Sequence, residues 1–211
     1  DFLTTRPMEI EKKSFEIIKG ELGEEFVSRY PADALPVLCR VIHTTADFSY
    51  RDTLTITEGA IGLAKEAIHR GLPIITDTTM AASGINKTAA RKFGIDVHCF
   101  IGDEDVKEAA KASGMTRSAV SAEKAARLYP ECIYAVGNAP TALMRLYELI
   151  EEKKIRPALI IGVPVGFVNV VEAKELILRT DVPAIVARGR KGGSNIAAAI
   201  CNALLYEAGG R

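Results

Sequence analysis

The chain has no excess of charge of either sign, because its 27 lysine and arginine residues are balanced by 27 aspartate and glutamate residues. A protein that binds nucleic acid or a membrane surface usually carries a basic excess or a basic stripe. The balance argues against both kinds of partner, and we expect neither. Any anionic ligand has to be recognised by a local group of cations.

Long apolar runs and paired cysteines are also missing. No segment approaches the roughly 20 apolar residues of a membrane span, and the N-terminus has no apolar core of a signal peptide. The four cysteines, Cys39, Cys99, Cys132 and Cys201, lie singly in apolar runs and form no CxxC pair, which is typical of reduced, buried thiols. We therefore expect a cytoplasmic protein in which residues 1–7 precede the folded core.

The chain does contain short β-branched runs that alternate with longer segments of helical period, each run closed by glycine, proline or aspartate. This alternation is typical of a βα-repeating chain. We predict strands at 53–57, 73–77, 95–100, 132–136, 158–163 and 183–187. We predict helices at 58–69, 117–129, 140–154 and 194–207. Several runs are apolar on both faces, so we expect one three-layer α/β/α domain over residues 1–211, with a mostly parallel sheet of about six strands.

Four of the loops after these strands are rich in glycine, hydroxyl and amide groups: TDTTMAASGIN, VGNAPT, GVPVGFVN and RGRKGGSN. Ligands of open α/β sheets bind outside the carboxyl ends of the strands, where such loops offer backbone N–H groups to an anion. The last loop also places three cations beside two glycines: Arg188, Arg190, Lys191, Gly192 and Gly193. We predict that it binds an anion and that Ser194 caps the following helix. GxxxxGK[ST] is absent and no GxGxxG follows the first strand, which argues against a nucleotide-phosphate loop.

His43 is the best candidate for acid/base chemistry. In the segment 31–48 apolar residues trace one helical side, and Arg40 and His43 fall three residues apart on the other side. An arginine can hold a carboxylate while a neighbouring imidazole gives or takes a proton near neutral pH. The residues alone also allow a surface histidine at a helix C-terminus. His69, at a helix end, and His98, within a strand, are poorer candidates, and no second ligand stands at metal-binding spacing, so we expect no metal site.

Five segments together resemble the precorrin-8X methylmutase family along nearly the whole chain: SFEII, CRVIHTTADF, GNAPTAL, GVPVGFVNVVEAK and RGRKGGSN. The resemblance implies an α/β/α fold, a homodimer, and an isomerisation without a cofactor, in which the methyl group on C11 of a corrinoid precursor migrates to C12. It implies that His43 is the proton donor and acceptor. It further implies that Ser14 and Arg40 contact the substrate and that Arg117 lies near it. We expect Arg40 and the basic loop at 188–193 to meet the several carboxylates of such a substrate.

The family divides between a metal-free substrate and a cobalt-containing one, and the HTTADF continuation after His43 is closer to the cobalt branch. Two other functions remain open. A non-catalytic tetrapyrrole carrier would share every anion-binding feature without needing His43. A nucleotide-dependent oxidoreductase would use a similar sheet, but the glycine fingerprint and the ribose-binding acid that it needs are missing.

Overall fold

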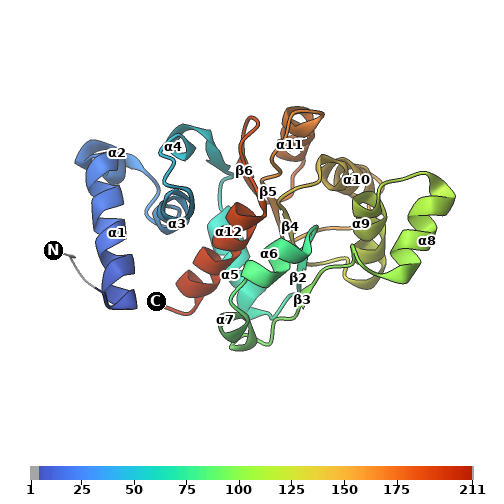
Figure 1. Cartoon of the computed structure of the whole chain (residues 1–211), viewed down its shortest axis with the longest axis horizontal. Coiled ribbons are helices and arrows are strands. Elements are labelled where there is room, and N and C mark those ends of the chain that lie inside the picture. Colours follow the sequence, from blue (N-terminus) through green and yellow to red (C-terminus); the bar gives the residue numbers. More distant parts are fainter. Residues whose placement is uncertain (1–4, 211) are drawn as a thin grey trace.

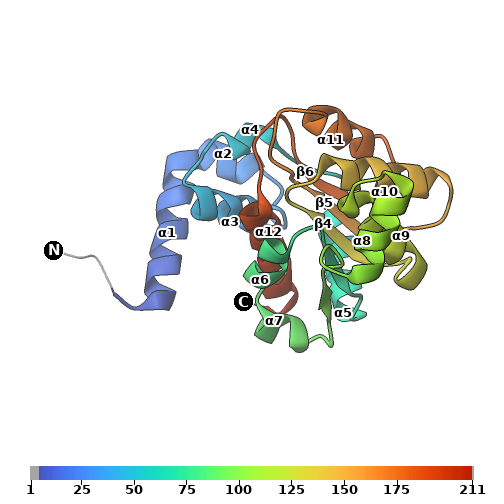
Figure 2. The same ribbon diagram turned by 45° about the vertical axis from the view of Figure 1, so that its right-hand side comes forward.

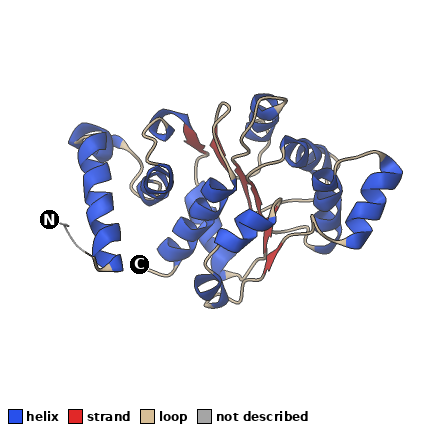
Figure 3. Cartoon of the chain, viewed as in Figure 1, coloured by secondary structure: helices blue, strands red, loops and turns tan. Residues whose placement is uncertain are grey.

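The computed structural model describes residues 5–210, and its centre is a six-stranded sheet with the order β1-β6-β5-β4-β2-β3 (Figures 1 and 3). Neighbouring strands are parallel except for β1, which runs antiparallel to β6. The strands are β1 (Leu54–Ile56), β2 (Ile74–Thr76), β3 (Val97–His98), β4 (Ile133–Val136), β5 (Leu159–Gly162) and β6 (Ala184–Ala187).

Twelve helices within residues 5–210 surround this sheet. They are α1 (Pro7–Leu22), α2 (Glu24–Arg29), α3 (Leu35–Thr45), α4 (Tyr50–Thr53), α5 (Ala60–His69), α6 (Thr79–Gly84), α7 (Lys87–Arg91), α8 (Glu104–Ser113), α9 (Arg117–Leu128), α10 (Pro140–Glu151), α11 (Val170–Leu178) and α12 (Ser194–Ala208). Three of them carry a proline in their first turn, where its missing N–H would in any case lack an intrahelical partner: Pro7, Pro36 and Pro140.

The sheet is covered on both faces (Figure 2), and its side chains alternate between two hydrophobic cores. In β4, Ile133 and Ala135 face a core shared with α1, α3, α5, α6, α7 and α12. Tyr134 and Val136 face a second core, shared with α8, α9, α10 and α11. Because both faces are buried, the central strands read as continuous apolar runs in the sequence.

The predicted three-layer α/β/α fold and its mostly parallel sheet are confirmed, and all six predicted strands are present in shorter form. The four predicted helices are present as α5, α9, α10 and α12. Of the segment expected to precede the core, residues 1–4 lie outside the described residues, and α1 begins at Pro7. Between residues 5 and 210 no helix is long and apolar enough to cross a bilayer.

The carboxyl ends of β2, β4, β5 and β6 meet at one edge of the sheet, called here the carboxyl edge. The antiparallel β1 starts at the same edge, because the Arg188 N–H donates to the Thr53 carbonyl oxygen at 2.9 Å. α12 also starts there, and Gly137 makes room for it. A Cβ at position 137 would lie 2.6 Å from the Cα of Ser194, so only glycine allows this close approach.

Candidate functional site

The loop between β6 and α12, residues 188–193, is held by a buried lysine. The Lys174 ammonium on α11 donates to the carbonyl oxygens of Gly189, at 2.8 Å, and Lys191, at 2.9 Å. Lys174 is 0% exposed, and no carboxylate of residues 5–210 pairs with it. Burial lowers the pKa of Lys174 to about 8. Because the two carbonyls stand on either side of Arg190, Lys174 fixes the backbone before and after that residue.

Two of the loop's three predicted anion-binding cations are engaged within the chain. The Arg188 guanidinium donates to both carboxylate oxygens of Glu175 on α11, each at 2.8 Å. The Lys191 ammonium donates to Asp47, at 2.6 Å, and to the Ser49 hydroxyl, at 3.0 Å. The hydrogen bond from Lys191 lowers the pKa of the Asp47 carboxyl to about 2. These two cations therefore tie the loop to α11 and to the segment after α3.

Arg190 is the third cation of the loop, and its surroundings differ. Its guanidinium lies over the ring of Phe167, 5.5 Å from the ring centroid, and forms no ion pair with a described residue. Its carbonyl oxygen accepts from the Gly166 N–H at 3.1 Å, which joins the basic loop to the loop after β5. A guanidinium stacked on an aromatic ring keeps its edge N–H groups for a carboxylate. Of the loop's three cations, Arg190 is the one that is open to a ligand.

The glycines of this loop are required by close packing. A Cβ on Gly192 would overlap the Val163 carbonyl oxygen, and Gly193, whose φ is +144°, donates its N–H to that same oxygen at 2.8 Å. The prediction that Ser194 caps α12 is wrong: Gly193 occupies the N-cap position and Ser194 is the first helical residue. The Ser194 hydroxyl instead pairs with the Thr78 hydroxyl at 2.7 Å, because the close approach of α12 brings it to the loop after β2.

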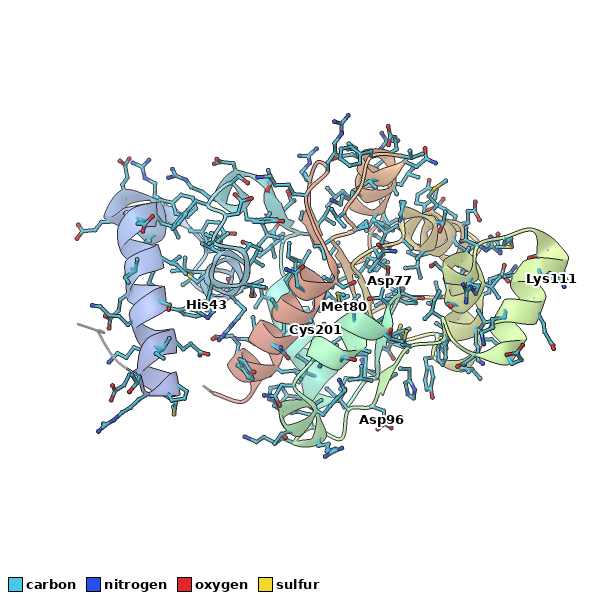
Figure 4. The ribbon with its side chains drawn as sticks, in the orientation of Figure 1. His43, Asp77, Met80, Asp96, Lys111 and Cys201 are labelled. Atoms are coloured by element: carbon cyan, nitrogen blue, oxygen red, sulfur yellow. The ribbon has the colours of Figure 1, made fainter. Side chains whose placement is uncertain are left out.

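The loop after β4, residues 137–139, already binds an anion, and that anion belongs to the chain. The carboxylate of Asp77 accepts from the N–H groups of Gly137 (2.8 Å), Asn138 (2.9 Å) and Ala139 (2.8 Å). Asp77 is buried just after β2, as Figure 4 shows. Burial raises the pKa of its carboxyl, and the three N–H donors oppose that rise. The prediction that this loop offers its N–H groups to a bound anion is therefore wrong, because Asp77 already accepts from them.

His43 lies on the exposed side of α3, between α3 and α1 in Figure 4. Its ring meets the ring of Phe15 edge-on, with 5.6 Å between the centroids. No described residue forms a hydrogen bond with the imidazole. His43 is four residues before Asp47, which follows the end of α3 and binds Lys191, so the end of α3 is tied to the basic loop. The exposed imidazole is therefore accessible to a ligand.

Arg40 is placed on α3 as the sequence predicts, but it is largely enclosed. Its guanidinium makes a bidentate pair with Glu11 of α1, at 3.0 and 3.1 Å, and its side chain is 13% exposed. It also lies 4.8 Å from the ring centroid of Phe15 and 5.2 Å from that of Tyr206. The residue joins α1, α3 and α12 beside a crevice of about 250 Å³. A substrate carboxylate would have to share or replace the Glu11 contact.

Ser14 and Arg117 lie in different places. Ser14, the residue before Phe15 on α1, donates its hydroxyl to the Ile10 carbonyl oxygen at 2.8 Å. Arg117 is the exposed first residue of α9, a helix on the opposite face of the sheet. The structure thus brings His43 and Arg40 to Phe15, which follows Ser14 on α1, while Arg117 stands apart.

The other two histidines take part in local packing. The His69 Nδ1 lies 2.8 Å from the Lys65 carbonyl oxygen, and the ring packs edge-on against Phe93. His98 stacks on Tyr129, with 4.7 Å between the centroids. Both rings are therefore held by contacts within the chain.

A hollow of about 1080 Å³ lies at the opposite edge of the sheet, among the segments that lead into β4, β5 and β6. Cations and carboxylates are mixed on its rim, and two of them are paired with neighbours: Lys154 with Glu152 and Glu131 with Arg70. The carboxyl edge differs because its basic loop has an open cation, Arg190, and is bound to Asp47, four residues after His43. We therefore place the functional site there.

The fold and these loops define a three-layer α/β/α domain with a cationic loop at the carboxyl edge of its sheet, bound to the end of the helix that carries His43. The chain belongs to the precorrin-8X methylmutase family, whose model matches residues 9–207. The members of this family are isomerases of cobalamin biosynthesis that move a methyl group within one molecule.

Curated relatives and a solved structure cover nearly the whole chain. A cobalt-precorrin-8 methylmutase of Leptospira interrogans is 44% identical over 96% of this chain and 94% of its own length. A precorrin-8X methylmutase of Pseudomonas aeruginosa is 36% identical over 94% of each chain. The structure of the precorrin-8x methyl mutase from Thermus thermophilus matches with a TM-score of 0.86 at 37% identity, over 95% of this chain and 98% of that one. The family resemblance of the sequence motifs is confirmed.

Replacing Lys174 with methionine should loosen the basic loop, because methionine fills a similar volume but donates no hydrogen bond to Gly189 or Lys191. We expect trypsin to cut within residues 188–191 several-fold faster in Lys174→Met than in the wild type. Limited digestion followed by mass spectrometry measures this rate. Lys111→Met, on the exposed surface of α8, is the control and should leave the rate unchanged. Equal cutting in both variants would show that Lys174 does not hold the loop.

The pair between Asp47 and Lys191 should give the stability of the fold a specific pH dependence. A carboxyl whose pKa falls from 3.8 to about 2 on folding stabilises the fold above the higher value, and this contribution is lost as the pH falls towards the lower one. We expect the wild type to be more stable than Asp47→Asn at about pH 6, and the difference to shrink below about pH 4. Urea unfolding across this range measures it. A difference that does not change with pH would contradict the assignment.

Proposed function

We propose that this chain is a cobalt-precorrin-8 methylmutase, which moves the methyl group on C11 of the macrocycle to C12 and yields cobyrinic acid. The metal-free substrate would give hydrogenobyrinic acid by the same step. The observation that carries the proposal is the exposed His43 at the end of α3, tied through Asp47 to a rigid basic loop with one open cation. Family membership supplies the reaction class.

The chemistry needs little from the protein besides a proton and a fixed orientation. In a 1,5-sigmatropic shift the bond from the methyl carbon to C11 breaks as its bond to C12 forms, so no electrons enter or leave and no nucleophile is required. A proton placed near ring C makes the receiving carbon more electron-poor. We assign this proton to His43, whose imidazole forms no hydrogen bond with a described residue. Holding the macrocycle in one tautomer lowers the barrier further.

The carboxylates of the substrate are the proposed ligands of the site's cations. Arg190 is the loop cation best placed to bind one, whereas Arg188 and Lys191 act by fixing the loop around it. Ser14, on α1 next to Phe15, remains a proposed substrate contact, as does Arg40 if a substrate carboxylate replaces Glu11. Arg117 would reach only a part of the substrate that crosses the carboxyl edge to the other face.

We propose cobalt in the substrate and none held by the protein. The relative from Leptospira interrogans, at 44% identity, is named for the cobalt-containing substrate, and the relative from Pseudomonas aeruginosa, named for the metal-free substrate, is 36% identical. The described residues contain no group of three histidine, cysteine, aspartate or glutamate side chains that could hold a metal ion. The protein is proposed to work in the cytoplasm, as a homodimer and without a cofactor.

Removing the imidazole should abolish most of the turnover. General acid/base help is typically worth about 10² to 10⁴ in rate, so we expect His43→Ala to lose turnover by a factor of that order while it still binds cobyrinic acid. The visible absorption spectrum measures the reaction, because the methyl shift changes the conjugation of the ring.

The assay uses precorrin-8 in its cobalt and metal-free forms, with His69→Ala as the matched control. Turnover by the wild type and by His69→Ala, but not by His43→Ala, would support the assignment. Undiminished turnover in His43→Ala would remove the imidazole from the mechanism. Binding without conversion by the wild type would favour a tetrapyrrole carrier.

A further inference from the structure

The loop after β5 exposes apolar side chains that the described chain leaves uncovered. Phe167 is 83% exposed and Val168 is 75% exposed, and Val165 is 47% exposed beside them. None of these three side chains belongs to either hydrophobic core. Patches of this kind mark sites where a ligand or a partner binds.

The tip is held in place from two sides. On the basic loop, the Arg190 carbonyl oxygen accepts the Gly166 N–H at 3.1 Å, and the Arg190 guanidinium lies over the Phe167 ring. At the start of α11, Asn169 adopts the left-handed conformation, with φ +59°, which turns the chain from the tip into the helix. Phe167 is therefore presented to solvent by anchored backbone.

The apolar loop tip and the Arg190 guanidinium together are complementary to one kind of ligand. A bound molecule would meet apolar surface at Phe167 and Val168 and a guanidinium at Arg190 in the same place. Such a ligand needs an extended apolar face with a carboxylate at its margin. A tetrapyrrole macrocycle with acetate and propionate side chains has this chemistry, whereas a small hydrophilic anion does not.

We propose that Phe167 and Val168 lie against the apolar face of the macrocycle while Arg190 pairs with one of its peripheral carboxylates. This proposal rests on the proposed function. It makes the loop after β5 part of the substrate site, with a role in orienting the ring that is separate from the proton transfer at His43. The contact would bury apolar surface that is exposed in the free protein, which favours binding.

A second copy of the chain is a less suitable occupant. A twofold interface uses the same patch on both subunits, so an interface over this tip would bury the Arg190 guanidinium of each subunit, which has no described carboxylate partner. α1 offers another surface for self-association, because Ile10 and Ile17 are 43% and 45% exposed and lie seven residues apart on one side of the helix.

A tryptophan at position 167 tests the contact directly, because the chain contains no tryptophan. The probe is cobyrinic acid, the proposed product. We expect it to shift the emission of Phe167→Trp to shorter wavelength and to protect the new side chain from quenching by acrylamide. The matched control is Leu128→Trp, at a position that is 50% exposed at the opposite edge of the sheet, and it should show neither change.

Binding of the same probe measures the strength of the contact. We expect Phe167→Ala to weaken the binding of cobyrinic acid by about tenfold or more, and Phe167→Leu to recover most of the loss, because leucine restores apolar surface. Circular dichroism should be unchanged, since the side chain is exposed.

The other outcomes are distinct. If the wild type turns over its substrate while the emission of Phe167→Trp does not respond to the bound probe, the inference is wrong and the function stands. If Phe167→Asp converts a dimer to monomers in sedimentation velocity, the patch belongs to a second copy and the inference is overturned. If the wild type neither binds nor converts a corrinoid, the proposed function itself fails.

Discussion

The arrangement of the carboxyl edge depends on the ammonium of Lys174, buried under the loop between β6 and α12. A buried charge without a carboxylate is costly, and two carbonyl oxygens of that loop are what offset the cost here. The loop cannot move away without leaving the ammonium unsatisfied. Its path is therefore fixed, and the direction of each of its three cations follows from it.

The fixed path of the loop gives its three cations different roles: two are paired within the chain and one is open to a ligand. Arg188 is drawn back onto α11 by Glu175, and Lys191 is drawn across to the end of α3 by Asp47. The Arg190 guanidinium, between them, contacts the Phe167 ring and pairs with no carboxylate of residues 5–210. A protein with no net charge can thus present the Arg190 guanidinium to a ligand beside the apolar side chain of Phe167. The same loop is bound to the end of the helix that carries His43.

Much of the fold could be predicted from the sequence because its signals are local. The apolar runs at β4, β5 and β6 are buried on both faces, and no other element fits short runs of that kind. The antiparallel direction of β1 could not be predicted, because it depends on its pairing with β6, which lies far along the chain.

The candidate residues of the site were also visible in the sequence, but their partners were not. Lys191 and Asp47 are 144 positions apart, and Asp77 meets the loop after β4 some 60 residues away. No periodicity or spacing reports such contacts, so the sequence does not show that Arg188 and Lys191 are paired with carboxylates while Arg190 is not. It also missed Lys174 and Asp77, whose only signal was a charged residue inside or just after an apolar stretch.

Whether Arg190 is the loop cation that binds the substrate can be decided by comparing the dissociation constants of cobyrinic acid for Arg190→Ala and Arg188→Ala. We expect Arg190→Ala to weaken binding by about tenfold or more, as the loss of a charge-assisted pair does. We expect a smaller loss for Arg188→Ala, because Arg188 acts only through the loop. Equal binding by Arg190→Ala and the wild type, or a greater loss in Arg188→Ala, would show that Arg190 does not have this role.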